Sequence, residues 1–271
     1  MLQGKTIGFI GGGNMAEALV KGLVKGGIAA DSIQVADPVA ARREYLSTNY
    51  KVRATTDNQA VAADCDVLIL AVKPQVAAVA LSELVQQLTA EKLLISIMAG
   101  VTTAAIEKSF SQPVRVVRTM PNTPALVLQG ATALAAGAHA RPEDIASTKY
   151  IFGMVGKCWQ VEEKLMDAVT GLSGSGPAYV LTFIEALSDA GVKNGLTREV
   201  ASGLALQTVL GTASLLAETG EHPAVLREKV TSPGGTTIAG LQALENGGFR
   251  GTVMRGVEAA TQRSVELGKK S

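Results

Sequence analysis

The sequence is poor in the residues on which several common kinds of protein depend. Its 271 residues include only two cysteines, Cys65 and Cys158, and two histidines, His139 and His222. The cysteines lie far apart and without metal-ligand spacing, so we expect neither a disulfide framework nor a bound metal. A glycine-rich segment also interrupts the apolar N-terminus early, which argues against a signal peptide. Together these absences predict a protein of the reducing cytoplasm.

An excess of charge is also lacking, and aromatic side chains are sparse. The chain has 25 basic and 24 acidic residues, and aromatic residues make up 4% of it. Its longest basic runs are Arg42-Arg43 and Lys269-Lys270. A nucleic-acid-binding face normally combines clustered basic and aromatic side chains, so we expect no nucleic-acid partner. The apolar share of 47% suffices for a large core, and the length suits two domains.

Charged residues are absent from one long helical pattern, residues 200–217. Its length approaches that of a short membrane span, which is one alternative. However, polar and small residues interrupt it, namely Ser202, Gly203, Gln207, Thr208, Gly211, Thr212 and Ser214. We therefore interpret the segment as a helix that is buried on most sides within protein, without a membrane. A monomer would expose its apolar flanks, so we also expect a homodimer.

A phosphate-binding turn is predicted near the N-terminus. A short, apolar, β-favouring run at residues 5–10 ends in three glycines, and a helix-forming sequence follows at once. Gly11 permits the tight turn, Gly13 lets the backbone approach a pyrophosphate, and Ala16 keeps helix and strand closely packed. The amides at the start of the helix would face the anion. We predict dinucleotide binding, with a glycine-rich turn that binds nothing as the alternative.

The acidic residue Asp37 follows the second predicted strand, residues 33–36. An acid at this place can accept hydrogen bonds from the adenosine ribose hydroxyls and repels a 2′-phosphate, which favours NAD over NADP. Arg42 and Arg43 lie within the next helical turn and could reach a phosphate. The alternative is that both belong to a solvated helix face.

Strands and helices alternate through the first half of the chain. Further predicted strands are residues 51–54, 67–72, 93–97 and 114–117, with one helix starting at Asp57-Asn58 and another covering 76–89. This alternation predicts an α/β fold with a doubly wound parallel sheet, whose ligand crevice is lined by loops such as Lys73-Pro74. Residues 130–136 and 159–161 are expected as closing strands around a helix near 142–152.

From about residue 163 the pattern is helical only. The expected helices cover residues 165–170, 177–194, 197–218, 223–231, 236–246 and 250–267. We therefore predict a Rossmann domain at 1–162 and an all-helical domain for substrate binding and dimerisation at 163–271. The loops 171–177 and 232–237 bring amides and hydroxyls, Ser175 among them, to helix N-termini. Such loops favour a site for a substrate carboxylate, with helix capping alone as the alternative.

Five segments of the chain together carry a family resemblance. They are residues 9–16, 71–74, 120–125, 172–179, and 222–223 with 232–238. Together they resemble the pyrroline-5-carboxylate reductase family over essentially the whole chain, and the last segment is the most specific. The resemblance implies reduction of 1-pyrroline-5-carboxylate to L-proline, the last step of proline biosynthesis, by NADH or NADPH. It also implies dimers with interleaved helices, which in this family often assemble further into rings.

The resemblance also implies site residues. Cofactor contacts carry over to Ile10, Gly11, Gly12, Gly13, Asn14, Met15, Asp37, Asn58, Ala71, Val72, Lys73, Pro74, Ile97, Met98 and Ala99. Substrate contacts carry over to Glu163, Thr236 and Thr237. The chain departs from the family at Asp37-Pro38, where NADPH-preferring members often have a small polar residue followed by a basic one. A strict preference for NADPH is therefore not expected.

Reduction of a cyclic imine requires few catalytic side chains. The imine accepts hydride far better once its nitrogen is protonated, so the site must stabilise a protonated nitrogen or supply the proton. We predict Thr237 as the catalytic residue, with a hydrogen bond to the ring nitrogen. The amides near Gly235, Thr236 and Thr237 would hold the substrate carboxylate, and Glu163 would orient the ring or a bridging water.

Two other classes of protein remain as alternatives. A related dehydrogenase for β-hydroxyacids would need a catalytic lysine, and Lys193 is a candidate, although Gly195 follows closely. The second alternative is a dinucleotide-binding sensor without enzyme activity, which would have no need of the loop at 232–237. His139 and His222 lack a nucleophile pattern, so we expect a loop position for the first and a structural role for the second.

Overall fold

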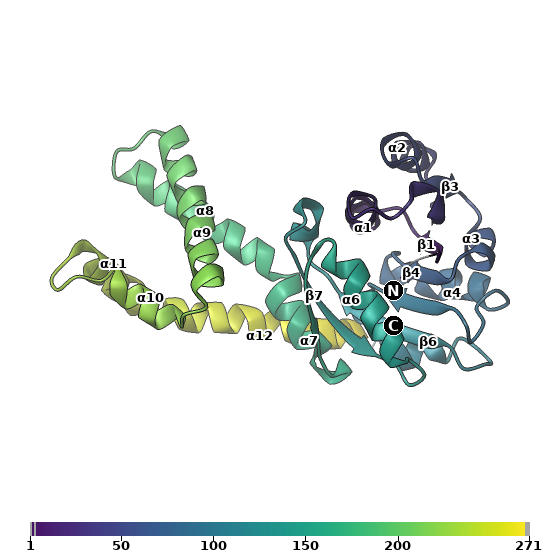
Figure 1. The fold of residues 1–271 in the computed structure, drawn as a ribbon. Coiled ribbons are helices and arrows are strands. Elements are labelled where there is room, and N and C mark those ends of the chain that lie inside the picture. The colour runs from purple at the N-terminus through teal and green to yellow at the C-terminus, as the bar shows by residue number, and fades with distance from the viewer. Residues whose placement is uncertain (1, 3, 269–271) are drawn as a thin grey trace. The chain divides into compact units, whose positions relative to one another are not determined.

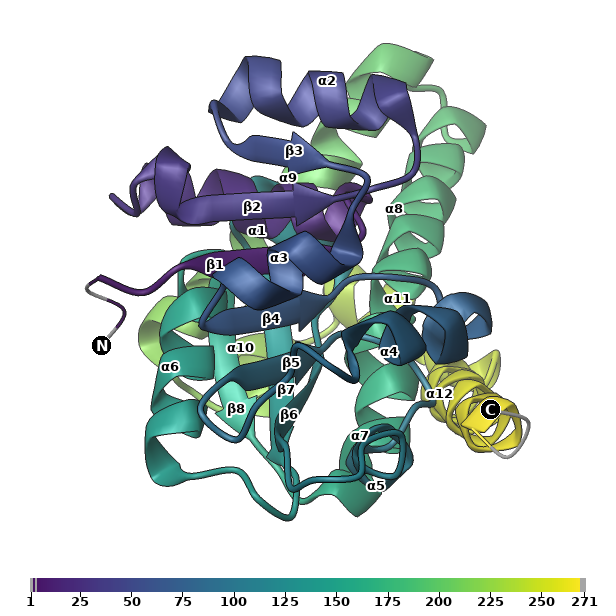
Figure 2. The same ribbon diagram turned by 90° about the vertical axis from the view of Figure 1, so that its right-hand side faces the viewer.

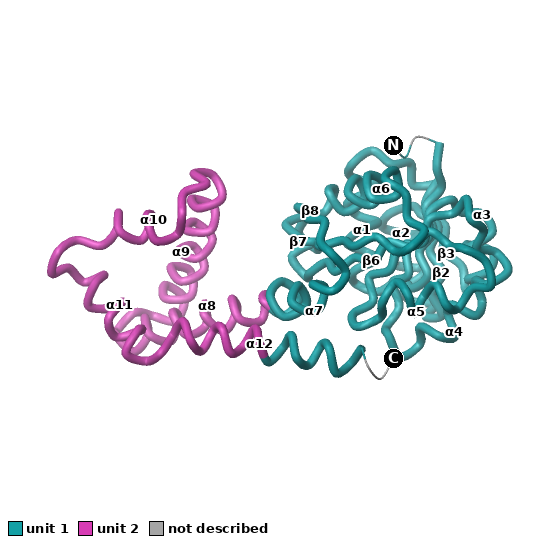
Figure 3. The backbone as a smooth tube through the Cα atoms, turned by 90° about the horizontal axis from the view of Figure 1, so that it is seen from below, with its two compact units in different colours: residues 1–175, 259–271 teal, residues 176–258 magenta. Residues whose placement is uncertain are grey.

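The computed structural model describes residue 2 and residues 4–268 of the chain (Figure 1). Contacts within the chain divide it into two compact units, which Figure 3 shows in different colours. The first unit contains the residues up to Ser175 together with those from Ala259 onward. The second unit contains Gly176–Glu258 and is thus an insertion into the first along the chain.

The first unit is built on one sheet of eight strands. They are β1 (Ile7–Ile10), β2 (Ile33–Ala36), β3 (Arg53–Thr55), β4 (Val67–Leu70), β5 (Leu93–Ser96), β6 (Arg115–Met120), β7 (Gly130–Ala136) and β8 (Gly156–Gln160). Their order in the sheet is β3-β2-β1-β4-β5-β6-β7-β8. Strands β1 to β6 are parallel to one another, whereas β7 is antiparallel to β6 and parallel to β8.

The doubly wound parallel sheet expected from the sequence is confirmed, with its last two strands reversed. The reversal has a simple cause in the connection between β6 and β7. Parallel strands need a crossover of about a dozen residues or more, usually a helix. Here the link holds only the short 3-10 helix Thr123–Val127, so the chain turns back antiparallel.

Helices cover both faces of this sheet (Figure 2). They are α1 (Asn14–Lys25), α2 (Ala40–Tyr50), α3 (Asn58–Asp64), α4 (Ala77–Leu84), α5 (Thr103–Glu107), α6 (Pro142–Gly153) and α7 (Met166–Val169). One core lies between the sheet and α1, α2 and α6 and includes Phe9 and Ile69. The other lies between the sheet and α3, α4 and α5 and includes Leu68 and Leu94. Because successive strand residues point to opposite faces and both are covered, β1 and β4 carry no polar side chain, and β5 carries one only at its last residue, Ser96.

The segment that follows β8 belongs to the first unit. It comprises the 3-10 helix Glu163–Leu165, α7 and the π-helix Thr170–Gly174. Met166 is buried against β7, and the hydroxyl of Ser264 in α12 (Phe249–Gly268) donates a hydrogen bond of 2.6 Å to Asp167. These contacts explain why the chain divides at Gly176, although the sequence pattern becomes helical from residue 163.

The second unit consists of helices whose ends follow local sequence signals. They are α8 (Gly176–Lys193), α9 (Arg198–Thr219), α10 (Pro223–Lys229), α11 (Thr236–Asn246) and the first part of α12. The Thr197 hydroxyl accepts a hydrogen bond from the Val200 amide before α9, and Gly220, with φ 65°, ends that helix. His222 Nδ1 accepts a hydrogen bond of 3.2 Å from the Ala224 amide. The structural role expected for His222 is confirmed, since it caps α10.

Helix α9 exposes most of its apolar surface within the single chain. Its buried residues are Ala201 and Ala205, whereas its leucines at 204, 206, 210 and 215 are between 49% and 57% exposed. The expectation that residues 200–217 are buried on most sides is therefore wrong for one chain on its own. Among the described residues, α9 is also the one helix that is long and apolar enough to cross a membrane, judged by length and composition alone.

Candidate functional site

The glycine-rich turn joins β1 to α1 and has a conformation that requires glycine at its first position. Gly11 has φ 99°, and a Cβ on it would lie 2.6 Å from the carbonyl oxygen of Ala71. Hydrogen bonds to the neighbouring strands hold the turn in place. The Gly11 amide donates to the Ala36 carbonyl at 2.7 Å, and the Ala71 amide donates to the Ile10 carbonyl at 2.8 Å. A residue with a side chain would be strained here both by its backbone and by this close approach. The tight turn predicted at Gly11 is confirmed.

Gly13 differs, because nothing in the protein itself requires a glycine there. Its φ of −66° and ψ of −175° are open to any residue. Apart from its chain neighbours, no heavy atom of the described residues would lie within 4 Å of a Cβ at this exposed position. No side chain of the described chain caps α1, so the amides at Asn14 and Met15 are open to an anion. Both features fit a pyrophosphate that approaches the backbone closely.

Asp37 ties the end of β2 to the glycine-rich turn. Its Oδ2 accepts a hydrogen bond of 2.7 Å from the Gly12 amide, and its Oδ1 accepts one of 2.8 Å from the Val39 amide. The carboxylate is therefore held beside the phosphate-binding turn, where an acid can meet ribose hydroxyls and disfavours a further phosphate. The geometry agrees with the position predicted for this residue.

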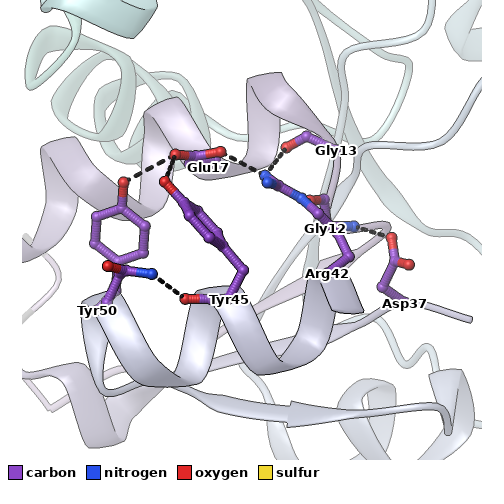
Figure 4. Close-up of polar contacts among 8 residues, drawn as sticks. Gly12, Gly13, Glu17, Asp37, Arg42, Tyr45 and Tyr50 are labelled. Carbon is purple, nitrogen blue, oxygen red and sulfur yellow. Dashed lines mark hydrogen bonds and ion pairs between the residues drawn. The ribbon is translucent and has the colours of Figure 1, made fainter. Parts of the chain in front are cut away.

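The two arginines of α2 are engaged with the backbone of the turn and of the strand end. Arg42 Nε donates to the Gly12 carbonyl at 2.5 Å, and its Nη2 lies 2.6 Å from Glu17 Oε2 (Figure 4). Arg43 Nη1 donates to the carbonyls of Asp37 at 2.8 Å and Pro38 at 2.9 Å. The alternative that both arginines form a solvated helix face is therefore wrong.

Glu17, in the first turn of α1, lies at the centre of a network that the sequence analysis missed. Besides Arg42, it accepts hydrogen bonds at Oε1 from the hydroxyls of Tyr45 at 2.9 Å and Tyr50 at 3.0 Å. Burial alone would raise the pKa of Glu17, but these hydrogen bonds and the charge of Arg42 outweigh it and lower the pKa. Burial and the bond to Glu17 raise the pKa of Tyr50 to about 12. A charged pair 25 residues apart carries no local sequence signal.

The loops that follow β4 and β5 lie at the same edge of the sheet as the glycine-rich turn. The register pairs Ile10 with Leu70, and Leu70 with Ser96, at the carboxyl ends of the three strands. Residues 71–74 and 97–99 come next, so the structure brings them to the crevice where such sheets bind ligands. Met98 is 2% exposed with its side chain in the core, so only its backbone can face a ligand.

Asn58 is the first residue of α3, directly after Asp57, whose side chain caps that helix. The helix start predicted at Asp57-Asn58 is therefore confirmed. The Asn58 side-chain amide donates a hydrogen bond of 2.6 Å to Glu83 of α4. Asn58 was predicted as a cofactor contact, and its side-chain NH₂ group is already engaged within the protein by this bond.

Glu163 is committed to residues of its own unit. Its Oε1 accepts a hydrogen bond of 2.7 Å from the Thr103 amide, and its Oε2 accepts one of 2.6 Å from the Thr103 hydroxyl. Arg118 Nη1, on a side chain that is 4% exposed, lies 3.4 Å from Oε1. The sequence analysis missed Thr103 and Arg118, although a basic residue at the end of an apolar strand was a usable signal for a buried ionic partner.

The substrate residues predicted in the second unit lie at the start of α11. Gly235 precedes this helix, its amide donates to the Ser232 carbonyl at 3.1 Å, and no side chain of the described chain caps the helix. Thr236 and Thr237 form the first turn. Their amides are therefore available to a carboxylate. Ser175, the remaining predicted substrate residue, ends the π-helix of the first unit, where its amide donates to the Thr170 carbonyl at 2.9 Å.

Family models match both halves of the chain. Residues 163–267 match the model for pyrroline-5-carboxylate reductase dimerisation, and residues 6–100 match that for NADP oxidoreductase, coenzyme F420-dependent. A pyrroline-5-carboxylate reductase of Synechocystis sp. is 52% identical over 265 residues, which cover 97% of this chain and 98% of the relative. One of Glycine max is 47% identical over 263 residues, which cover 97% and 96%.

Solved structures agree with these relatives. A pyrroline-5-carboxylate reductase from Coxiella burnetii aligns with a TM-score of 0.93 and 39% identity, over 97% of this chain and 98% of that one. The Plasmodium falciparum pyrroline carboxylate reductase with NADP bound aligns with a TM-score of 0.88 and 35% identity, over 98% of each chain. Sequence, fold and the geometry of the glycine-rich turn thus agree, and the chain belongs to the pyrroline-5-carboxylate reductase family.

Proposed function

We propose that this protein reduces 1-pyrroline-5-carboxylate to L-proline, the last step of proline biosynthesis, with NADH or NADPH as the hydride donor. The observation that carries the proposal is a pair of uncapped helix N-termini, each preceded by a glycine-rich loop: α1 after Gly13 and α11 after Gly235. One suits the pyrophosphate of a dinucleotide, and the other suits the carboxylate of a small substrate. The names of the relatives, which align over nearly their whole length, support the same reaction.

The residues that would hold the nucleotide come from the carboxyl edge of the sheet. The amides of residues 13–15 would bind the pyrophosphate, and Asp37 would accept hydrogen bonds from the ribose hydroxyls. The loops at 71–74 and 97–99, with Asn58, would contact the rest of the nucleotide. The nicotinamide, when bound, supplies the hydride.

The residues at the start of α11 would grip the substrate. The amides of Thr236 and Thr237 would hold the carboxylate, next to Gly235, whose own amide is bonded to the Ser232 carbonyl, and the Thr237 hydroxyl would hydrogen-bond the ring nitrogen. Reduction adds a hydride to the imine carbon, and the electron pair of the C=N bond moves to the nitrogen, which carries a proton. A hydroxyl beside that nitrogen stabilises its protonated form and keeps the ring in a fixed orientation.

Glu163 has a less direct part in this proposal than the sequence suggested. Both of its oxygens accept hydrogen bonds from Thr103, so a direct bond to the substrate would be an additional one. We therefore assign Glu163 as a positioning residue, which holds the start of α5 and the loop that follows β5. Ser175 would reach the substrate through its hydroxyl, since its amide is engaged.

We also propose that two copies of the chain pair through the helical domain at 163–271, and that dimers assemble further in the cytoplasm without a membrane. The half-exposed leucines of α9 support this, because such an apolar surface is uncommon on a monomer. Light scattering should give at least a dimer at micromolar concentration. Replacement of Leu210, which is 57% exposed, by glutamate should lower the molar mass towards that of one chain. A wild-type monomer would contradict the pairing.

The decisive experiment makes two measurements. One follows the oxidation of NADH and of NADPH in the presence of 1-pyrroline-5-carboxylate, and the other follows the reduction of the oxidised cofactors in the presence of β-hydroxyacids. Turnover with the imine alone is the expected result. Turnover with a hydroxyacid alone would favour the dehydrogenase alternative, and nucleotide binding without turnover would favour a sensor. Crystals with cofactor and proline should show the proline carboxylate at the first turn of α11. A nicotinamide far from Thr237 in every copy would contradict the mechanism.

A further inference from the structure

Four side chains form a network behind the phosphate-binding turn: Glu17 of α1 and Arg42, Tyr45 and Tyr50 of α2, called here the Glu17 cluster (Figure 4). We propose that Arg42 positions the glycine-rich turn for the pyrophosphate of the nucleotide and does not bind the 2′-phosphate of NADP. This inference rests on the dinucleotide binding of the proposed function. It assigns a residue that lies beside the turn and touches it from the side of α2.

Arg42 holds the turn at more than one point. Besides the bond from Nε to the Gly12 carbonyl, its Nη2 donates to the Gly13 carbonyl at 3.4 Å and to Glu17 at 2.6 Å. A guanidinium group can do this because its donors point in a fixed, planar fork. These bonds fix the carbonyl groups of Gly12 and Gly13. They therefore also fix the amides of Gly13 and Asn14, which belong to the same peptide groups. Those amides are the ones that would meet the pyrophosphate.

The positive charge of Arg42 also offsets a negative charge close to the phosphate-binding turn. Glu17 lies in the first turn of α1, close to the amides that would bind the anion. An uncompensated carboxylate there would repel a pyrophosphate. Its side chain is 18% exposed, so water screens it only in part, and the ion pair with Arg42 cancels its charge. Arg42 therefore keeps the site neutral enough for an anion.

The rest of the Glu17 cluster restrains Arg42 in this position. Tyr45 and Tyr50 fix the second oxygen of Glu17, and the Arg42 guanidinium lies 5.1 Å from the centre of the Tyr45 ring. If Arg42 turned towards a 2′-phosphate, it would leave the Glu17 carboxylate without its ionic partner and the Gly12 carbonyl without its donor, while the Gly13 carbonyl would keep its bond from the Glu17 amide. Asp37, held by the Gly12 and Val39 amides, adds a negative charge beside the ribose. The network thus favours the turn over the 2′-phosphate as the partner of Arg42.

The two possible roles of Arg42 predict opposite results for two conservative variants. Arg42→Lys keeps the positive charge but loses the planar fork, so a positioning role predicts weaker binding of NADH and NADPH by the same factor, about tenfold. A 2′-phosphate contact predicts that NADH binding is unchanged. Glu17→Gln frees Arg42 from its ionic partner, so a 2′-phosphate contact predicts tighter binding of NADPH alone. Positioning of the turn instead predicts that NADH and NADPH binding change by the same factor.

Fluorescence titration of the full-length wild type and of each variant with NADH and with NADPH, at one salt concentration, gives the dissociation constants to be compared. The exposed pair Arg141 and Glu143, 3.8 Å apart at the start of α6, supplies matched controls: Arg141→Lys and Glu143→Gln should bind as the wild type does. At saturating nucleotide, kcat of the Arg42→Lys variant should stay within about twofold, so the defect is in KM, whereas general loss of structure would lower kcat as well. Should a variant unfold, Tyr50→Phe, which removes one bond to Glu17, should weaken both nucleotides by about twofold.

Unequal effects on NADH and NADPH, or wild-type binding by Arg42→Lys and Glu17→Gln, would overturn the proposal for Arg42 while leaving the proposed reaction intact. If the wild-type protein binds neither nucleotide, the proposed function fails first and this inference fails with it. The wild-type titration therefore separates the two kinds of failure.

Discussion

Alanine at Gly13 should weaken nucleotide binding with little change in stability, whereas alanine at Gly11 should destabilise the fold. At Gly13 the backbone conformation suits any residue, and a Cβ would meet no heavy atom within 4 Å apart from its chain neighbours. Alanine lowers the entropy of the unfolded chain, worth about 0.4–1 kcal/mol, but is a poorer N-cap than glycine by about 1 kcal/mol. These effects nearly cancel, so the free energy of unfolding should change by less than about 1 kcal/mol.

Binding should respond much more strongly than stability at Gly13. The methyl group of alanine would occupy the space through which a pyrophosphate approaches the amides of α1. We expect the dissociation constants of NADH and NADPH to rise about 10- to 100-fold, which corresponds to about 1.4–2.8 kcal/mol.

At Gly11, in contrast, stability should fall, because φ is 99° and a Cβ would lie 2.6 Å from the Ala71 oxygen. Strain of this kind costs about 1–3 kcal/mol, so Gly11→Ala should unfold at a lower temperature.

Two measurements on each variant test this reasoning: thermal unfolding without ligand, and fluorescence titration with each nucleotide. Gly153, at the end of α6, is another glycine whose added Cβ would meet nothing within 4 Å and serves as the control. Gly153→Ala should bind both nucleotides as the wild type does. Wild-type affinity in Gly13→Ala would refute the idea that a ligand approaches the backbone there. Wild-type stability in Gly11→Ala would refute the assigned strain.

Three further predictions concern single side chains. Thr237→Ala should lower kcat/KM about 10- to 100-fold without a change in the unfolding temperature, whereas Thr237→Ser should keep most activity; equal activity of all three proteins would remove the hydroxyl from the mechanism. Because the pKa of Glu17 lies below its ordinary 4.5 in the folded protein, its contribution to stability is present above that pH and is lost as the pH falls through the folded value. The deficit of Glu17→Gln in urea unfolding should therefore be present at neutral pH and shrink in acid, and a deficit independent of pH would contradict this. Burial raises the pKa of the Cys65 thiol to about 11 and also raises that of Cys158, so at pH 8 the folded protein should alkylate far more slowly than a free thiol, and Cys65 modified at the rate of the unfolded chain would contradict its burial.

The sequence predicted most reliably those elements whose signals are local. The start of α11 at Thr236 and the end of α9 at Gly220 follow from a glycine at each boundary. The short helix α5 was missed, because five residues are too few for a helical period to appear. The reversed direction of β7 was also missed, since an apolar strand has the same pattern in either direction.

In the candidate site too, residues with a local sequence signal could be predicted, and residues whose partners are distant in the sequence could not. The glycine-rich turn and Asp37 could be predicted because strand, loop and helix adjoin in the sequence. The partners of Glu163 could not, because Thr103 lies 60 residues away along the chain. The contacts of Arg42 with Glu17 and Gly12 likewise depend on α1 and α2 packing side by side, which no local pattern encodes.

The path of α12 has a practical consequence for work on the nucleotide-binding half alone. This helix begins in the second unit and ends in the first, where Ser264 is bound to Asp167 and a Cβ on Gly268 would lie 2.9 Å from the Gly100 oxygen. A polypeptide cut after residue 175 would therefore lose part of its own fold. A short linker from residue 175 to residue 259 should restore it, and a protease nick between those positions should leave two fragments that stay associated.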